Sequence, residues 1–199
     1  MVEQYICNKT YIILCEGSSE KAYIQLINRL LTKNNIKITF AAKEIGTGHF
    51  SDVEKAYKKQ CKENKKLDKV IWVDKDIYKR NDRNNGIEYA GKADNIPDFL
   101  FTTYNFEDFL VMHLDDNIIN TWQQILNTKG HFNMPLKSSE YIPLIKENID
   151  IFNNYEKGDI PFEITLDNIK QAYKIHQTTT INFKCDFLDF LNSITGHWL

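Results

Sequence analysis

Short apolar runs that stop abruptly at acidic residues are the feature that most constrains how this chain can fold. Residues 11–15 (Tyr-Ile-Ile-Leu-Cys) and 70–73 (Val-Ile-Trp-Val) are continuously apolar, and an acid follows each run at once. A run of about four to eight such residues is typical of a strand covered on both faces, as in a parallel sheet. Further strands are predicted at 36–41 and 99–104.

Helical patterns separate these strands. Apolar residues recur at three- and four-residue spacing over 20–31, which predicts an amphipathic helix capped by Ser18 or Ser19. A second helix is predicted to begin at Ser51 and Glu54, which have the spacing of a capping box. Strands that alternate with helices imply right-handed crossovers. The predicted fold class is therefore α/β, with a Rossmann-like parallel sheet flanked by helices.

The second half of the chain is predicted to be mainly helical. Helical spacing is found in residues 106–114, 118–126, 141–152, 166–175 and 183–194. No linker separates the two halves, and 199 residues that are 42% hydrophobic suit one core. We expect an α/β core over residues 1–115 and a helical C-terminal extension over 116–199 that packs on it.

Charge and cysteine usage limit the environment and the partners. A formal net charge of -2 excludes a chain that coats nucleic acid by overall positive charge, so a polyanion would need a local basic patch or bound cations. The four cysteines are scattered, which predicts reduced thiols. The chain shows no signal-peptide pattern and no run of about 20 apolar residues, so we expect a cytoplasmic protein without a membrane partner.

Acidic residues follow three of the predicted strands. They are Glu16 and Glu20, Asp74 and Asp76, and Glu107 and Asp108. In an open α/β sheet, ligands bind beyond the carboxyl ends of the strands, so these side chains are expected to converge. Hard oxygen ligands suit Mg²⁺ or Mn²⁺ rather than zinc. Each acid alone is more commonly a helix cap or a solvated side chain, whereas the set favours a metal site.

Three motifs resemble those of a known superfamily. Residues 14–20 (Leu-Cys-Glu-Gly-Ser-Ser-Glu) resemble the first motif of Toprim proteins, and residues 72–76 (Trp-Val-Asp-Lys-Asp) resemble their strand-borne Asp-x-Asp. Within that superfamily the chain is most similar to RloB-like proteins. Residues 105–114 resemble their later motif, a Phe-Glu pair before an apolar helix and a His. Ser19 stands where Thr is usual, and Asn105 where a small residue or Cys is frequent.

The resemblance implies an endonuclease related to OLD-type Toprim nucleases, often used in bacterial defence against phage and often encoded beside an ATPase. By analogy, Asp74 and Asp76 would bind one metal ion, and Glu16 would share it or act as general acid or base. Glu20 and Glu107 would complete a second metal position. The implied catalytic residues are Glu16, Glu20, Asp74 and Asp76, with Mg²⁺ or Mn²⁺ in a two-metal site.

The substrate is expected to be a nucleic acid, either tRNA or DNA. Lys75, Lys79 and Arg80 are the nearest candidates for holding its phosphates, and solvated loop cations are an equal alternative. The sequence leaves open the choice of substrate and whether the chain forms a homo-oligomer.

Three further features have mainly structural interpretations. The lysines at the end of the second helix could follow a nucleic-acid backbone, but lysines there also complement the helix dipole, and we slightly favour a solvated helix end. His113 lies in an apolar helical pattern and is expected to be structural. Aromatic residues of the second half could stack on bases, yet most follow apolar stripes and are expected in the core: Trp122, Tyr141, Tyr155, Tyr173 and Trp198.

Two alternatives remain beside the nuclease. One is a Toprim module that cuts only inside a complex with its ATPase. The other is a non-catalytic interaction module in which the acids only cap helices. A P-loop is excluded because the chain has no G-x-x-x-x-G-K-[ST] string. A response-regulator receiver fits the Glu16-Gly17 motif poorly.

Overall fold

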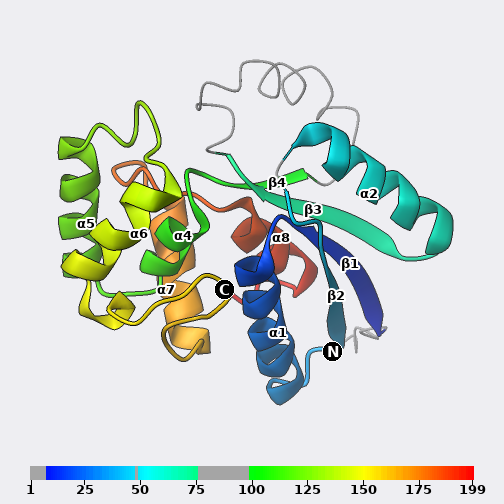
Figure 1. The fold of residues 1–199 in the computed structure, drawn as a ribbon. Helices are drawn as coiled ribbons and strands as arrows, with labels where there is room; N and C mark the ends of the chain where they lie inside the picture. Colours follow the sequence, from blue (N-terminus) through cyan, green and yellow to red (C-terminus); the bar gives the residue numbers. More distant parts are fainter. Residues whose placement is uncertain (1–7, 48, 76–98) are drawn as a thin grey trace.

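A parallel sheet forms the centre of the protein, as the computed structural model shows for residues 8–47, 49–75 and 99–199 (Figure 1). Its strand order is β2-β1-β3-β4, and every neighbouring pair is parallel. The strands are β1 (Lys9–Cys15), β2 (Ile38–Glu44), β3 (Asp68–Asp74) and β4 (Phe99–Thr102). The four predicted strands are confirmed, with ends that shift by a few residues.

Helices cover both faces of the sheet (Figure 1). Ile12 and Leu14 of β1 pack with Phe50 and Val53 on one face, whereas the alternate residues of β1 join the larger core on the other. This alternation is what a strand between two layers requires. The described helices are α1 (Ser18–Lys33), α2 (Phe50–Glu63), α4 (Phe106–Val111), α5 (Asp116–Thr128), α6 (Ser138–Asn148), α7 (Leu166–Gln177) and α8 (Asp186–Ile194), with a 3₁₀ turn η3 at Asp150–Phe152.

The larger core continues from the sheet into the helical half. The rings of Trp72 on β3 and Phe187 on α8 stack with their centroids 4.4 Å apart. Trp122 of α5 and Phe152 of η3 belong to the same buried cluster. The predicted α/β class with a mainly helical C-terminal half is thus confirmed. Of the aromatic residues expected in the core, Trp122, Tyr141 and Tyr155 are buried there, whereas Tyr173 and Trp198 are half-buried against it.

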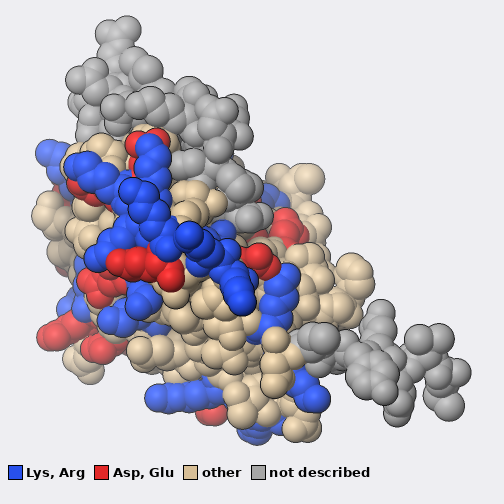
Figure 2. Space-filling model, turned by 90° about the vertical axis from the view of Figure 1, so that its right-hand side faces the viewer, with Lys and Arg blue, Asp and Glu red and all other residues tan. Residues whose placement is uncertain are grey.

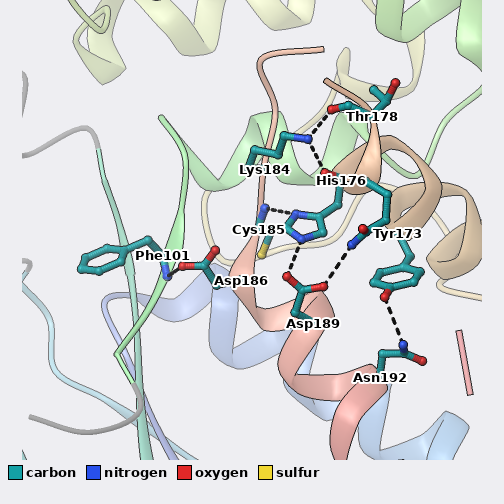
Figure 3. A network of polar contacts seen from close by, with 10 residues as sticks. Phe101, Tyr173, His176, Thr178, Lys184, Cys185, Asp186, Asp189 and Asn192 are labelled. Carbon is teal, nitrogen blue, oxygen red and sulfur yellow. Dashed lines mark hydrogen bonds and ion pairs between the residues drawn. The ribbon is translucent and has the colours of Figure 1, made fainter. Parts of the chain in front are cut away.

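The segment that leads into α8 closes the outer edge of β4 (Figure 3). The Phe101 amide donates to Asp186 Oδ2 at 3.0 Å, and the Thr103 amide donates to the Lys184 carbonyl at 2.8 Å. Lys184 in turn donates to the carbonyls of His176 and Thr178 at the end of α7. Since edge strands otherwise expose unpaired backbone groups, these contacts fix β4 and the chain that follows it.

The predicted helix caps were wrong. Ser18 is the first residue of α1, its N-cap is Gly17, and Ser19 Oγ accepts from the Gly158 amide instead. The Glu20 carboxylate accepts from the Gly17 amide, so the helix start is satisfied without a serine. Ser51 lies inside α2, which begins at Phe50 with His49 as N-cap.

Three of the predicted thiols can be located. Cys15 and Cys185 are buried, Cys61 is half-buried, and all three are free. Cys7 lies outside the described residues. None of the helices in the described ranges is both long enough and apolar enough to cross a bilayer.

His113 joins α1 to the segment that follows α4. Its Nδ1 lies 3.0 Å from the Phe109 carbonyl oxygen, and its Nε2 lies 2.8 Å from the Tyr23 hydroxyl. A carbonyl only accepts, so Nδ1 carries the proton and Nε2 accepts from Tyr23. Burial lowers the pKa of His113 to about 4. The ring is neutral at physiological pH and has the structural position expected for it.

This burial predicts a pH-dependent loss of stability. The pKa of His113 falls from 6.5 in the unfolded chain to about 4 in the folded protein, so acid favours unfolding as the pH drops through that window. Between pH 7 and pH 5 the wild type should lose about 2 kcal/mol more unfolding free energy than His113→Asn. Urea titrations at both pH values measure this difference. Equal pH dependence of the two proteins would contradict the buried neutral imidazole.

Candidate functional site

The first contacts of the site join the ends of neighbouring strands. Glu16 follows β1 directly, and Asp74 is the last residue of β3, which pairs with β1. The Asp74 amide donates to Glu16 Oε2 at 3.1 Å. Asp74 Oδ2 accepts from the Phe106 amide at 3.1 Å, at the start of α4. Three segments far apart in the sequence therefore meet at the carboxyl edge of the sheet.

Glu20 lies in the first turn of α1 beside these groups. It is 4% exposed, and its Oε2 accepts from the Gly17 amide at 3.2 Å. Burial, and after it the charges of Glu16 and Glu107, together raise the pKa of Glu20 to about 8. The charges of Glu16 and Glu107 act on Glu20 because these acids, from different segments of the chain, lie near it.

Glu107 is the second buried acid, also 4% exposed. Burial raises its pKa, whereas the charge of Lys157 and a hydrogen bond from Tyr155 act in the opposite direction. The Tyr155 hydroxyl donates to Glu107 Oε1 at 2.9 Å. This hydrogen bond orients the Glu107 carboxylate, which burial separates from water.

A loop from the helical half packs against the start of α1. The Gly158 amide donates to Ser19 Oγ at 2.9 Å. Gly158 has φ +103°, and a Cβ atom there would lie 3.0 Å from Ser18 Oγ. Glycine is therefore required both by the backbone conformation and by the close approach. With Tyr155, this loop connects the first motif to Glu107.

Sequence reasoning missed the role of this loop. Tyr155 was interpreted as a core aromatic, which its burial bears out, but its hydroxyl also holds Glu107. Lys157 and Gly158 were not singled out. Their residues carry no local pattern that predicts contact with a motif more than a hundred positions earlier, and the isolated glycine was the sole available signal.

Asp108, next to Glu107, is an anchor. It is fully buried and accepts from Trp122 Nε1 at 3.0 Å and from the Tyr141 hydroxyl. His131 Nδ1 accepts from the Leu136 amide, so Nε2 carries a ring proton, and it lies 3.3 Å from Asp108 Oδ2 outside hydrogen-bond geometry. These bonds tie α4 to α5 and α6 and thereby fix the backbone of Glu107.

Of the three cations predicted to bind phosphate, one lies within the described residues. Lys75 is exposed, and its ammonium lies 5.6 Å from the centroid of the Phe101 ring. Asp76, Lys79 and Arg80 lie outside the described residues. The structure brings the segments that carry Glu16, Glu20, Asp74 and Glu107 to one edge of the sheet.

The donor chemistry of these acids fits a hard divalent cation. All four offer carboxylate oxygens. Burial is the main cause of the raised pKa of Glu20, and the charges of Glu16 and Glu107 add a repulsion that a cation would relieve. Within the described ranges, no three His, Cys, Asp or Glu side chains are grouped closely enough to hold a metal ion. The predicted ligand set also contains Asp76, which those ranges do not include.

The fold and its acidic edge assign the chain to a class of α/β proteins, and its sequence assigns it to a family. The fold belongs to the parallel α/β proteins that gather ligand-binding side chains beyond the carboxyl ends of their strands. The family model for RloB-like protein matches residues 11–195, and the chain therefore belongs to the RloB-like family.

Comparisons with solved structures and with curated proteins add to the family match. Among solved structures, the chain is similar to the C-terminal region of the OLD protein of Xanthomonas campestris pv. campestris, with 16% sequence identity and a TM-score of 0.33. That match covers 92% of this chain and 97% of the other. No curated protein matches the sequence.

Tyr155→Phe should show how firmly Glu107 is held. The change removes the hydroxyl but keeps the ring, so Glu107 loses a donor in a buried place. The free energy of unfolding should fall by about 1–3 kcal/mol. A double-mutant cycle with Glu107→Gln should give a coupling energy of about 1 kcal/mol. Tyr173→Phe, which removes a hydroxyl bonded to Asn192 on α8, is the control and should not couple to Glu107→Gln.

Gly158→Ala should disturb the loop through two effects that can be separated. Left-handed backbone strain and the contact with Ser18 Oγ both oppose the added methyl group. We expect a loss of about 1–3 kcal/mol of unfolding free energy. Gly130 has φ +70° and open space where a methyl group would lie, so Gly130→Ala should lose less unfolding free energy. Ser18→Ala should recover part of the Gly158→Ala loss, and no recovery would contradict the close approach.

Proposed function

We propose that this RloB-like protein is a divalent-metal-dependent endonuclease of the Toprim type that hydrolyses phosphodiester bonds in nucleic acid. The observation that carries the proposal is the meeting of Glu16, Asp74, Glu20 and Glu107 at the carboxyl edge of the sheet. Family membership supports it, because the motifs that hold these acids resemble those of Toprim nucleases. The proposed role is antiviral defence in the cytoplasm, with tRNA or DNA as substrate and an ATPase encoded alongside as partner.

The residues would divide the work as follows. Asp74, Asp76 and Glu16 would hold one Mg²⁺ or Mn²⁺, and Glu20 with Glu107 would hold a second. Bound metal ions activate water and polarise the scissile phosphate. The chain itself orients the ligands: the Asp74 amide holds Glu16, the Phe106 amide holds Asp74, and the Tyr155 hydroxyl holds Glu107.

These orienting bonds are compatible with metal binding. An ionised carboxylate offers about four acceptor sites, so one hydrogen bond orients it without using its full capacity. Outer groups of this kind fix the direction of metal ligands in many sites. Lys75, Lys79 and Arg80 stay the candidates for contact with substrate phosphates near the metal ions.

A non-catalytic interaction module is the second candidate, and one observation favours it. Glu20 accepts the Gly17 amide at the start of α1, which is the contact that a capping residue makes. Mn²⁺ titration calorimetry distinguishes the two, because caps need no cation. Heat of binding that disappears in Asp74→Asn supports the metal site, and a wild type that binds no Mn²⁺ supports the module.

Cleavage assays test the proposed function directly. Wild type, Glu16→Gln and Asp74→Asn are incubated with total tRNA and with plasmid DNA, each with Mg²⁺ or Mn²⁺. The wild type should cut at least one pool, and the two variants should lose at least about 100-fold in rate. Glu147→Gln, an exposed acid on α6, serves as control and should match the wild type. Equal cutting by all four proteins would contradict the site. A wild type that binds Mn²⁺ and cuts only after addition of its ATPase would establish the partner-dependent version.

A further inference from the structure

The acidic edge cannot attract a nucleic acid by its own charge. The acids of this edge supply no positive charge where the substrate must arrive, and the whole chain has a formal charge of -2. Duplex DNA carries about one negative charge per 1.7 Å of its axis. The proposed function, on which this inference rests, supplies cations at the acids only when metal is bound, so a basic surface elsewhere on the molecule would help to hold the substrate.

Such a surface lies on α2 and the turn after it. Six of the 25 basic residues of the chain fall within residues 55–66, and all six are exposed. We call them the α2 lysine face: Lys55, Lys58, Lys59, Lys62, Lys65 and Lys66. Figure 2 shows basic side chains gathered on the side of the molecule that α2 covers, with acidic side chains among them. Four of the lysines and Glu63 line a shallow depression of about 390 Å³.

A lysine outside this face already satisfies carbonyl groups at the C-terminal end of α2. Lysines there often satisfy the last carbonyl groups and the helix dipole. In this protein Lys69 does so, because its ammonium donates to the carbonyls of Asn64 and Leu67 just beyond α2. Within the described residues, Lys62, Lys65 and Lys66 take part in no ion pair. Lys62 lies in the last turn of α2 and complements its dipole, whereas Lys65 and Lys66 follow the helix, and all three side chains are exposed.

The other three lysines of the face form exposed ion pairs with neighbouring acids. Lys58 pairs with Glu54 at 2.9 Å, and Lys59 pairs with Glu63 at 3.9 Å. Lys55 pairs with Asp52 at 3.3 Å. Exposed pairs of this kind contribute about 0–1 kcal/mol each, so phosphate groups can replace the carboxylates at little cost.

The chemistry of the face selects one kind of partner. A protein or a membrane partner is usually held by exposed apolar or aromatic anchors. The exposed large hydrophobic residues of the described ranges are Met134 and Ile151, and both lie in the helical half. Residues 55–66 contain lysine and no arginine, and lysine contacts phosphate as a point charge without the paired geometry that reads bases. We propose that the α2 lysine face binds the phosphodiester backbone of nucleic acid without sequence preference.

The face runs along α2 away from the acidic edge, so a substrate must be long enough to reach both. Since α2 connects the parallel strands β2 and β3, it begins at their carboxyl edge and runs back along the sheet. Its 14 residues span about 21 Å, the length of about six base pairs of duplex. A nucleic acid longer than this can touch the acids and the lysines together.

The test compares two triple variants with the same change in charge. Lys58→Gln/Lys59→Gln/Lys62→Gln removes the centre of the face, and glutamine keeps a helix propensity close to that of lysine. Lys33→Gln/Lys129→Gln/Lys170→Gln removes three exposed lysines from other elements. Fluorescence anisotropy measures binding of total tRNA and of a 20-base-pair DNA duplex in EDTA, from 50 to 200 mM KCl, so that neither metal ions nor cleavage affect the result.

The face variant should bind the preferred nucleic acid about tenfold more weakly at 100 mM KCl, and the slope of log K against log salt should fall by about 2–3. The control variant should match the wild type. Unchanged slopes in the face variant, or equal losses in both variants, would overturn the inference while leaving the nuclease intact. The same variants are mixed with vesicles that contain phosphatidylserine. A face variant that loses vesicle binding but keeps its nucleic-acid binding would also overturn the inference. A wild type that binds neither nucleic acid in EDTA would also overturn the inference, whereas the proposed function is decided separately by the cleavage assay with Mg²⁺ or Mn²⁺.

Discussion

The hydrogen bond between the Asp74 amide and the Glu16 carboxylate is the contact on which the site depends. It joins the ends of two neighbouring parallel strands, and a parallel sheet is the arrangement that brings both ends to the same edge. From there the Phe106 amide ties Asp74 to α4, which carries Glu107. The register of the sheet therefore brings acids from distant parts of the sequence to one edge, where burial and then the charges of Glu16 and Glu107 raise the pKa of Glu20.

The helical half has a specific part in this arrangement. Asp108 is fixed by Trp122 and Tyr141, so the helices α5 and α6 set the position of α4. Tyr155 then reaches Glu107 from the loop that follows η3. Tyr104, between β4 and α4, has φ +70°, a conformation that costs free energy and persists only where its surroundings impose it. The geometry of the acidic edge thus rests on packing from both halves of the chain.

The parts of this fold that could be predicted from the sequence are those with local causes. Strands β1 and β3 are short apolar runs, and the helices follow apolar periodicity, so burial alone indicates both. The caps were mispredicted because Gly17 and His49 took the position that nearby serines could have held. The contacts of Tyr155 with Glu107 and of Gly158 with Ser19 span 48 and 139 positions. Such contacts depend on the final packing of the helical half, which no local pattern encodes.

Capping alone does not explain why the acids are buried. Asp115 caps α5 by accepting the amides of Asn117 and Ile118, and it does so while exposed to solvent. Glu20 accepts one amide at the start of α1, yet it is buried beside other acids, and its raised pKa records the cost of that position. A cap that served stability only would gain from exposure, as Asp115 does. Strongly perturbed carboxylates that share one edge of a sheet are more typical of functional sites, where such a cost is retained because the chemistry requires it.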